Sequence, residues 1–163
     1  MHAAADAEVL ARLLEKKEIC IVFAESCTAG MVSSTLARVP GISRWHCGSA
    51  VSYRDHTKQQ WLGITEDDIK RFTAVSEPVA RQMAIGVLSI TDEADYAASI
   101  TGHLGPDAPS GMDGTVYVSI AQRKDAAIES IGVWRFDLTE KNRVKRQEEA
   151  TALVLERLTK VLS

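Results

Sequence analysis

The sequence predicts an α/β fold: a three-layer α/β/α sandwich with a mixed, mostly parallel sheet. Helical and extended patterns alternate along the 163 residues, which is typical of a sheet with helices on both faces. The run ICIVFA (residues 19–24) is short and rich in β-branched residues, as in a strand buried on both faces. Residues 115–121 and about 127–136 form a strand pair around a short polar turn, so the sheet is expected to be mixed. No repeat or linker divides residues 1–163, which favours a single domain.

Two helices are expected in the first quarter of the chain. The first is amphipathic, with Asp6 as its N-cap and Val9 among the residues that face the core. The second is expected to begin near Thr28, directly after the buried strand. It should end near Val39, because Pro40 disfavours a helical conformation in the residue before it.

The remaining elements follow from caps, alternation and glycine content. Residues 46–53 alternate into a strand, and Ser76 is a suitable N-cap for the next helix. Residues 95–100 are predicted as a strand, followed by TGHLGPDAPSGMDG (residues 101–114), a long loop of the kind that often carries function. The last helix is expected to begin near Thr139. Its core-facing residues are predicted to be Val144, Thr151, Leu155, Leu158 and Leu162.

Composition and charge exclude several classes of function. A formal net charge of −3 gives no general attraction to nucleic acid or to anionic membranes, and no apolar run approaches a membrane span. Three cysteines without C-x-x-C spacing argue against a zinc site or a disulfide framework, so we expect no metal and a reducing, cytoplasmic location. Exposed amphipathic helices favour a homo-oligomer.

The segment IVFAESCTAGM (residues 21–31) carries the strongest indication of chemistry. In open α/β sheets, ligands bind where parallel strands end, and here a strand leads directly into a helix start. The backbone N–H groups of Thr28, Ala29 and Gly30 could hold an oxyanion or a phosphate, with Ser26 beside them as a nucleophile. The alternative is that Ser26 or Thr28 merely caps the helix.

A serine nucleophile needs a base, and three residues are candidates. Lys58 precedes Trp61 and Leu62 by three and four residues, so its stem can pack along an apolar helix face. A desolvated lysine loses proton affinity and can act as a base, whereas an ordinary surface lysine cannot. His56 and His103 remain open as alternatives. Cys27 is a rival nucleophile, because a helix start would lower the pKa of its thiol.

Four segments together resemble the CinA C-terminal domain family of competence/damage-inducible proteins. The resemblance covers nearly the whole chain in the same order. The segments are AESCTAG (24–30), VSYRDHTKQQWLGI (51–64), AVSEPVARQMAIGV (74–87), and ITGHLGP (100–106) followed by GTVYVSIA (114–121).

This resemblance implies a nicotinamide-nucleotide amidase, which converts nicotinamide mononucleotide to nicotinic acid mononucleotide and releases ammonia. It implies no metal or organic cofactor and a small nucleotide as the partner. By motif position, Ser26 matches the family nucleophile and Lys58 matches the lysine taken as the base. Tyr53 matches the tyrosine that opens the lysine segment, and we expect it to be a third catalytic residue, whose hydroxyl helps Lys58 to take the Ser26 proton.

The resemblance also implies residues that bind the substrate. Thr101 and Gly102 match the Thr-Gly pair of the loop that lines the substrate. An arginine at the head of the last helix is expected on the nucleotide, and both Arg143 and Arg146 satisfy this description.

Three departures from the family pattern bear on the substrate. Ala29 replaces a glycine, which is tolerable if the residue is helical rather than left-handed. Arg54 and Asp55 replace a Ser-Asn pair close to the lysine, and the loop carries His103 and Leu104 instead of small apolar residues. A loop altered in this way leaves a second interpretation open: a non-catalytic nucleotide-binding module that senses its ligand.

Overall fold

The buried run predicted from the sequence forms β1 (Ile21–Glu25), a strand flanked on both sides in a five-stranded sheet. This sheet is the centre of the computed structural model, which describes residues 3–163. Strand β1 runs parallel to both β2 and β3, and β4 pairs antiparallel with β3 and β5. The spatial order is β2 (His46–Val51), β1, β3 (Tyr96–Gly102), β4 (Thr115–Lys124) and β5 (Ala127–Asp137). The prediction of a mixed sheet is confirmed.

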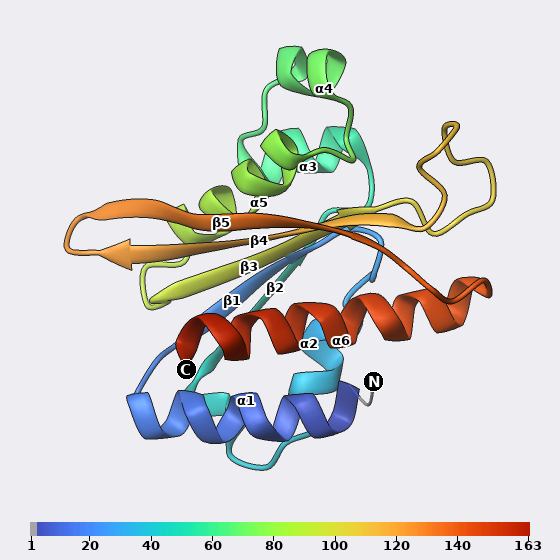
Figure 1. Ribbon diagram of the computed structural model, residues 1–163. Helices are drawn as coiled ribbons and strands as arrows, with labels where there is room; N and C mark the ends of the chain where they lie inside the picture. The colour runs from blue at the N-terminus through green and yellow to red at the C-terminus, as the bar shows by residue number, and fades with distance from the viewer. Residues whose placement is uncertain (1–2) are drawn as a thin grey trace.

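Helices cover both faces of this sheet, as the three-layer prediction requires (Figure 1). One face carries α1 (Ala3–Lys17), α2 (Met31–Leu36), the 3₁₀ helix η1 (Ile42–Arg44) and α6 (Arg143–Leu162). On the other face, α5 (Glu77–Ser89) packs against the sheet, and α3 (Asp55–Leu62) and α4 (Glu66–Phe72) pack against α5, with α4 farther from the sheet. Within residues 3–163, no helix has both the length and the apolar character needed to cross a membrane.

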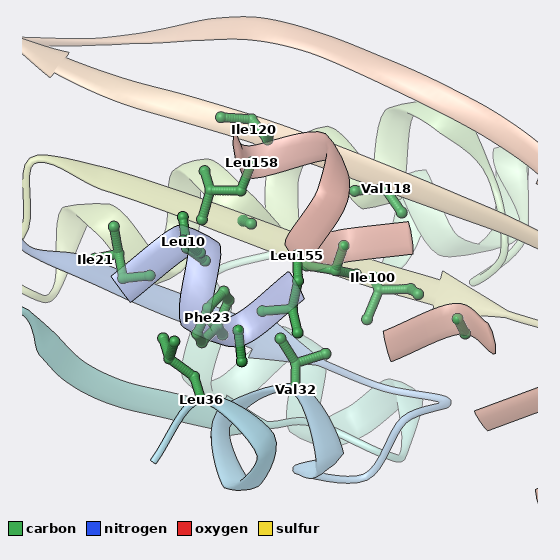
Figure 2. Packing of buried hydrophobic residues seen from close by; sticks show 14 of the residues in the cluster. Leu10, Ile21, Phe23, Val32, Leu36, Ile100, Val118, Ile120, Leu155 and Leu158 are labelled. Atoms are coloured by element: carbon green, nitrogen blue, oxygen red, sulfur yellow. The ribbon is translucent and has the colours of Figure 1, made fainter. Parts of the chain in front are cut away.

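Each face of the sheet has its own apolar core. On the first face, Leu10, Leu155 and Leu158 pack against the strand residues Phe23 and Val118 (Figure 2). On the second face, α5 buries the i, i+4, i+8 row that its sequence predicts, Val79, Met83 and Val87. The Ser76 hydroxyl accepts a hydrogen bond from the Val79 N–H, so the predicted N-cap is confirmed.

The first helix differs from its prediction in both cap and register. Asp6 lies inside α1, which already includes Ala3, so Asp6 is not the N-cap. Val9 is 45% exposed, and the buried face uses the smaller residues Ala7 and Ala11 beside Leu10. Small side chains let α1 lie close to α6, which explains why alanine rather than valine faces inward.

Two other helices are shorter than predicted. Helix α2 covers Met31–Leu36 rather than residues 28–39, because the chain forms a separate turn before it. Helix α6 begins at Arg143, where the Asn142 side chain accepts hydrogen bonds from two backbone N–H groups. Val144 is consequently on the exposed first turn rather than in the core, whereas the other four predicted core residues of α6 are buried.

Gly86 lets α5 pack against the end of α3. A Cβ at this position would lie 2.2 Å from the Leu62 carbonyl oxygen, so no side chain can be accommodated. Because Leu62 ends the same helix that carries Lys58, this close approach helps to fix where Lys58 lies.

We expect Gly86→Ala to destabilise the fold. Alanine favours a helix over glycine by roughly 0.5–1 kcal/mol, but overpacking against a backbone atom costs about 1–3 kcal/mol. Urea unfolding should therefore give a lower free energy of unfolding for Gly86→Ala, whereas Arg81→Ala on the exposed side of α5 should change it by less than about 0.5 kcal/mol. A Gly86→Ala protein as stable as the parent would contradict the packing described here.

Candidate functional site

The carboxylate of Glu25 organises the turn that carries Ser26. Glu25 ends β1, is 1% exposed and accepts five hydrogen bonds, which satisfies a buried charge. Its donors are the Thr28 hydroxyl at 2.7 Å, the backbone N–H groups of Gly30 (3.0 Å), Val32 (3.0 Å) and Ser33 (2.9 Å), and the Ser49 hydroxyl at 3.0 Å. The turn is thereby tied to both α2 and β2.

The backbone of this turn is left-handed where a helix was expected. Ala29 has φ of 52° and Gly30 has φ of 94°. Ala29 is thus left-handed rather than helical, and it adopts a conformation that glycine tolerates better. The Glu25 hydrogen bonds hold this conformation in place. Ser26 is 7% exposed, and its N–H donates to the Ile100 carbonyl of β3 at 3.1 Å.

The same hydrogen bonds decide which backbone donors remain for an oxyanion. The Ala29 N–H donates to the Ser26 carbonyl, and the Gly30 N–H donates to Glu25. Among the described residues, the N–H groups of Cys27 and Thr28 have no protein acceptor. A role of Ala29 and Gly30 as backbone donors is therefore incompatible with this conformation, and the free donors directly follow Ser26.

A cavity of about 220 Å³ lies beside Ser26, at the carboxyl ends of β1 and β3. Its wall combines segments that are far apart in the sequence. The predicted residues that line it are Ser26, Tyr53, Lys58, Thr101, Gly102 and Arg143. The nucleophile and base proposed from the sequence thus share one cavity.

Lys58 is buried in the wall of this cavity. Its side chain is 2% exposed, and it lies on the same side of α3 as the buried Leu62, whereas Trp61 is 50% exposed. The ordinary surface lysine considered from the sequence is therefore excluded. Burial lowers the pKa of Lys58, and the Asp55 carboxylate, 3.8 Å from Nζ, opposes part of that effect.

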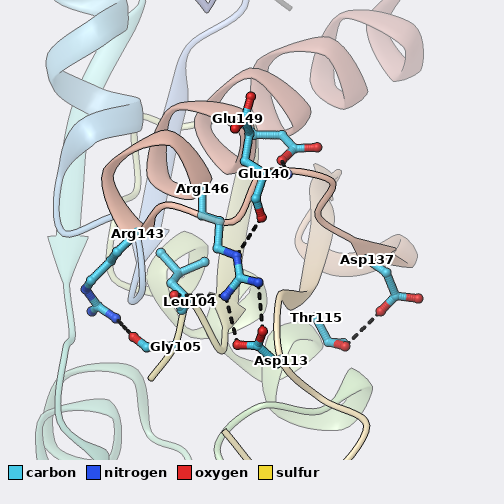
Figure 3. Close-up of polar contacts among 9 residues, drawn as sticks. All are labelled: Leu104, Gly105, Asp113, Thr115, Asp137, Glu140, Arg143, Arg146 and Glu149. Atoms are coloured by element: carbon cyan, nitrogen blue, oxygen red, sulfur yellow. Dashed lines mark hydrogen bonds and ion pairs between the residues drawn. The ribbon is translucent and has the colours of Figure 1, made fainter. Parts of the chain in front are cut away.

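The two candidate arginines have different environments (Figure 3). Arg143 is exposed at the cavity, where it donates to the Gly105 carbonyl and, at 2.7 Å, to the Tyr53 hydroxyl. Arg146 is 3% exposed and donates twice to Asp113, at 2.8 Å each. Arg146 thus fixes the loop of residues 103–114, and Arg143 is the arginine that remains accessible to a ligand.

Thr101 and Gly102 shape the cavity at the end of β3. The Thr101 hydroxyl donates to the Ala74 carbonyl at 2.9 Å. A Cβ on Gly102 would lie 2.4 Å from Cγ1 of Val116, so this position requires glycine for packing. Both residues contribute to the wall, and the Thr101 hydroxyl is already engaged.

The turn also borders a second cavity, away from Lys58. Thr28, Ala29 and Gly30 line this space of about 520 Å³ together with residues of α1, α2 and α6. None of the three lines the Ser26 cavity, and the N–H groups of Ala29 and Gly30 are already engaged. A contact between the free Thr28 N–H and a ligand in that cavity remains a prediction.

The other candidates for nucleophile and base are less suitable. Burial and the nearby Glu25 charge raise the pKa of the Cys27 thiol to about 12, opposite to the lowering expected at a helix start. His56 is exposed and does not line the cavity, whereas His103 does, and burial lowers its pKa. Among residues 3–163, no three His, Cys, Asp or Glu side chains are grouped as metal ligands.

Two residues of this site were not assigned a role from the sequence. Glu25 lies within the segment IVFAESCTAGM but receives no role there, although a buried carboxylate at the end of a strand must find donors. Asp113 was not singled out, because its partner Arg146 is 33 residues away. The role of Glu25 could have been inferred from its position after a buried strand, whereas the pairing of Asp113 with Arg146 could not.

We expect Glu25→Gln to destabilise the fold strongly. Three of the five donors to Glu25 are backbone N–H groups, and the NH₂ of glutamine cannot accept from them. Loss of charge-assisted bonds and an unpaired buried donor should lower the free energy of unfolding by about 2–3 kcal/mol in urea titrations. Glu15→Gln, at an exposed position of α1, is the control, and a similarly small effect of Glu25→Gln would contradict the role assigned to Glu25.

We expect Cys27 to resist alkylation in the folded protein. Burial raises the pKa of the Cys27 thiol to about 12, so the reactive thiolate is disfavoured near neutral pH. Iodoacetamide treatment followed by peptide mass spectrometry should leave Cys27 unmodified, whereas denatured protein should be labelled at all three cysteines. Rapid labelling of Cys27 in the folded protein would restore it as a candidate nucleophile.

Comparison with known proteins agrees with the fold. A family model described as the CinA C-terminal domain matches residues 3–162. A CinA-like protein of Chlorobium limicola is 40% identical over 147 residues, which are 88% of this chain and 34% of that protein. A CinA-like protein of Thermotoga maritima is 35% identical over 157 residues, 95% of this chain and 36% of that protein. The chain thus spans about a third of the length of these curated relatives.

A solved structure of a competence or damage-inducible protein from Enterobacter asburiae is 27% identical, with a TM-score of 0.89 over 100% of this chain and 99% of that one. The competence/damage inducible protein CihA from Agrobacterium tumefaciens is also 27% identical, with a TM-score of 0.84 over 96% and 95% of the two chains. The sequence match and the shared fold together show that this chain belongs to the CinA C-terminal domain family.

Proposed function

We propose that the protein is an amidohydrolase that converts nicotinamide mononucleotide to nicotinic acid mononucleotide and ammonia. The observation that carries this proposal is the shared cavity of Ser26 and the buried Lys58, whose pKa is lowered by desolvation. A serine that shares a cavity with an amine of lowered pKa has a base available to activate it. The resemblance of the four motifs to nicotinamide-nucleotide amidases supports the substrate.

The first half of the reaction forms an ester with the enzyme. The neutral amine of Lys58 takes the Ser26 proton as Oγ attacks the carboxamide carbon. The carbonyl oxygen becomes an oxyanion, which the free N–H groups of Cys27 and Thr28 can stabilise by roughly 3–4 kcal/mol for each well-placed donor. The Lys58 ammonium then donates its proton to the amide nitrogen, the C–N bond breaks, and ammonia leaves.

The second half releases the acid. Water loses a proton to Lys58 and attacks the ester carbon, the bond to Ser26 Oγ breaks, and Lys58 returns the proton to Ser26. Each proton that Lys58 accepts is donated again, so the cycle closes with the enzyme unchanged. The proposed reaction requires neither a metal nor an organic cofactor.

Arg143 and Tyr53 give the rim of the cavity its affinity for a nucleotide. The cavity is smaller than the roughly 300–1,000 Å³ of sites that enclose a whole drug-sized ligand, so it suits the pyridine carboxamide alone. The ribose phosphate would lie at the rim, where the Arg143 guanidinium can bind it in a bidentate manner. In this proposal Tyr53 positions Arg143, because its hydroxyl accepts an Arg143 hydrogen bond, and the help in proton transfer expected from the resemblance is not needed for the steps above.

We expect Ser26→Ala to abolish ammonia release from nicotinamide mononucleotide. The variant removes the nucleophile and leaves the Glu25 hydrogen bonds and the rim intact, so folding and nucleotide affinity should change little. The measurements are ammonia release under saturating substrate and nucleotide affinity by calorimetry. Ser43→Ala, at an exposed serine of η1, is the matched control and should retain full activity.

Other outcomes of this experiment would identify a different function. Normal turnover by Ser26→Ala would refute the serine mechanism. Binding of the nucleotide by the parent protein without ammonia release would favour the sensor module. A panel of nicotinamide compounds, compared by ammonia release, tests whether His103 and the altered loop have changed the substrate.

A further inference from the structure

Asp55 is the one acidic side chain that lines the cavity in the described part of the chain. It lies in the first turn of α3, three residues before Lys58, with its Oδ1 atom 3.8 Å from the Lys58 Nζ atom. The Asp55 side chain is 56% exposed, whereas that of Lys58 is 2% exposed. The Asp55 carboxylate is thus exposed to solvent at the rim of the cavity, whereas the Lys58 amine is buried in its wall.

None of the other titratable groups that line the cavity in the described residues carries a negative charge that could add to that of Asp55. From the turn after β1 comes the Cys27 thiol, whose pKa of about 12 keeps it neutral near physiological pH. From the loop after β3 comes His103, and burial lowers its pKa, which favours the neutral ring. From α6 comes the cation of Arg143, which is bound to the Tyr53 hydroxyl and to a carbonyl of the loop.

Glu25 is the other carboxylate near the turn after β1, and its charge is satisfied by hydrogen bonds outside the cavity. Both of its oxygens accept hydrogen bonds from donors of α2, β2 and the turn itself. Glu25 does not line the cavity. The local balance at Lys58 therefore consists of burial, which favours the neutral amine, and Asp55, which favours the ammonium.

We propose that Asp55 acts through Lys58, as a positioning residue that holds the ammonium in the cavity wall and moves the working range of the site toward alkaline pH. The proposal rests on the function proposed above, in which Lys58 must be neutral to accept the Ser26 proton. Before the attack, the Asp55 charge favours the ammonium form of Lys58, which cannot accept the Ser26 proton. The same charge stabilises the ammonium formed by the attack, until its proton passes to the leaving nitrogen.

Asparagine is close to aspartate in size but has no charge to favour the ammonium. With the burial of Lys58 unchanged, removal of the Asp55 charge leaves desolvation unopposed. The pKa of Lys58 should then fall further, and the amine should become neutral at lower pH.

The expected effect of Asp55→Asn is a shift of the rising limb of kcat/KM to lower pH by about one unit. This magnitude corresponds to a unit charge at about 4 Å in water-like surroundings. Asp55→Glu retains the charge and should keep the limb close to that of the parent. Asp92→Asn removes an exposed carboxylate just before β3, at the opposite end of the sheet, and should leave the profile unchanged.

A second measurement does not depend on turnover. With ¹³C-labelled lysine, the Cε signal of Lys58 can be titrated by NMR, and Lys58→Met identifies the signal by its disappearance. The Lys58 midpoint should move down in Asp55→Asn and stay in place in Asp92→Asn. An identical midpoint in the parent and in Asp55→Asn overturns the proposal, whether or not the protein hydrolyses the amide.

The two measurements together separate the two proposals. A shifted Lys58 midpoint in a protein that releases no ammonia supports the action of Asp55 and refutes the amidase. A shifted midpoint with an unshifted kcat/KM profile overturns the proposal that Asp55 sets the working range through Lys58. Coincident shifts in both measurements, absent from the Asp92→Asn control, support it.

Discussion

The hydrogen bonds to one buried carboxylate determine the conformation on which the rest of this site depends. Glu25 has no cation within ion-pair distance among the described residues, and its charge is satisfied entirely by donors from the turn, α2 and Ser49. These donors use the start of α2, which an incoming anion could otherwise occupy. The backbone donors at the start of α2 are therefore already bonded to Glu25, and only the N–H groups next to Ser26 remain available to a ligand.

Helix α3 places Lys58 where two effects on its pKa oppose each other. Lys58 is buried on α3, and the last residue of that helix, Leu62, packs closely against α5 because Gly86 has no side chain. Burial alone would favour a neutral amine, and the carboxylate of Asp55 at the rim restores part of the preference for the charged form. Lys58 is on a helix at one face of the sheet, and the turn after Glu25 leads into a helix at the other face. Lys58 and this turn meet at the carboxyl end of the sheet.

The sequence predicts the elements whose cause is local. The buried run at residues 19–24 and the Ser76 cap each depend on residues within one strand or one turn, and both are confirmed. Ala29 could not be predicted, because its left-handed backbone depends on Glu25 accepting bonds from Gly30 and from more distant residues. Ser26 and Lys58 were predicted from motif and amphipathic spacing, but that they line one cavity follows from the fold.

The two arginines illustrate the same limit at the level of single side chains. Arg143 and Arg146 both begin α6 and have similar local sequence, so their spacing gives no reason to prefer either for a ligand. The choice depends on Asp113, a residue of the distant loop, which binds Arg146 and leaves Arg143 at the rim. One helix start consequently performs two tasks: its buried arginine fixes the loop that closes the cavity, and its exposed arginine can contact what the cavity holds. A change in this loop would therefore alter the shape of the cavity and the position of its arginine together.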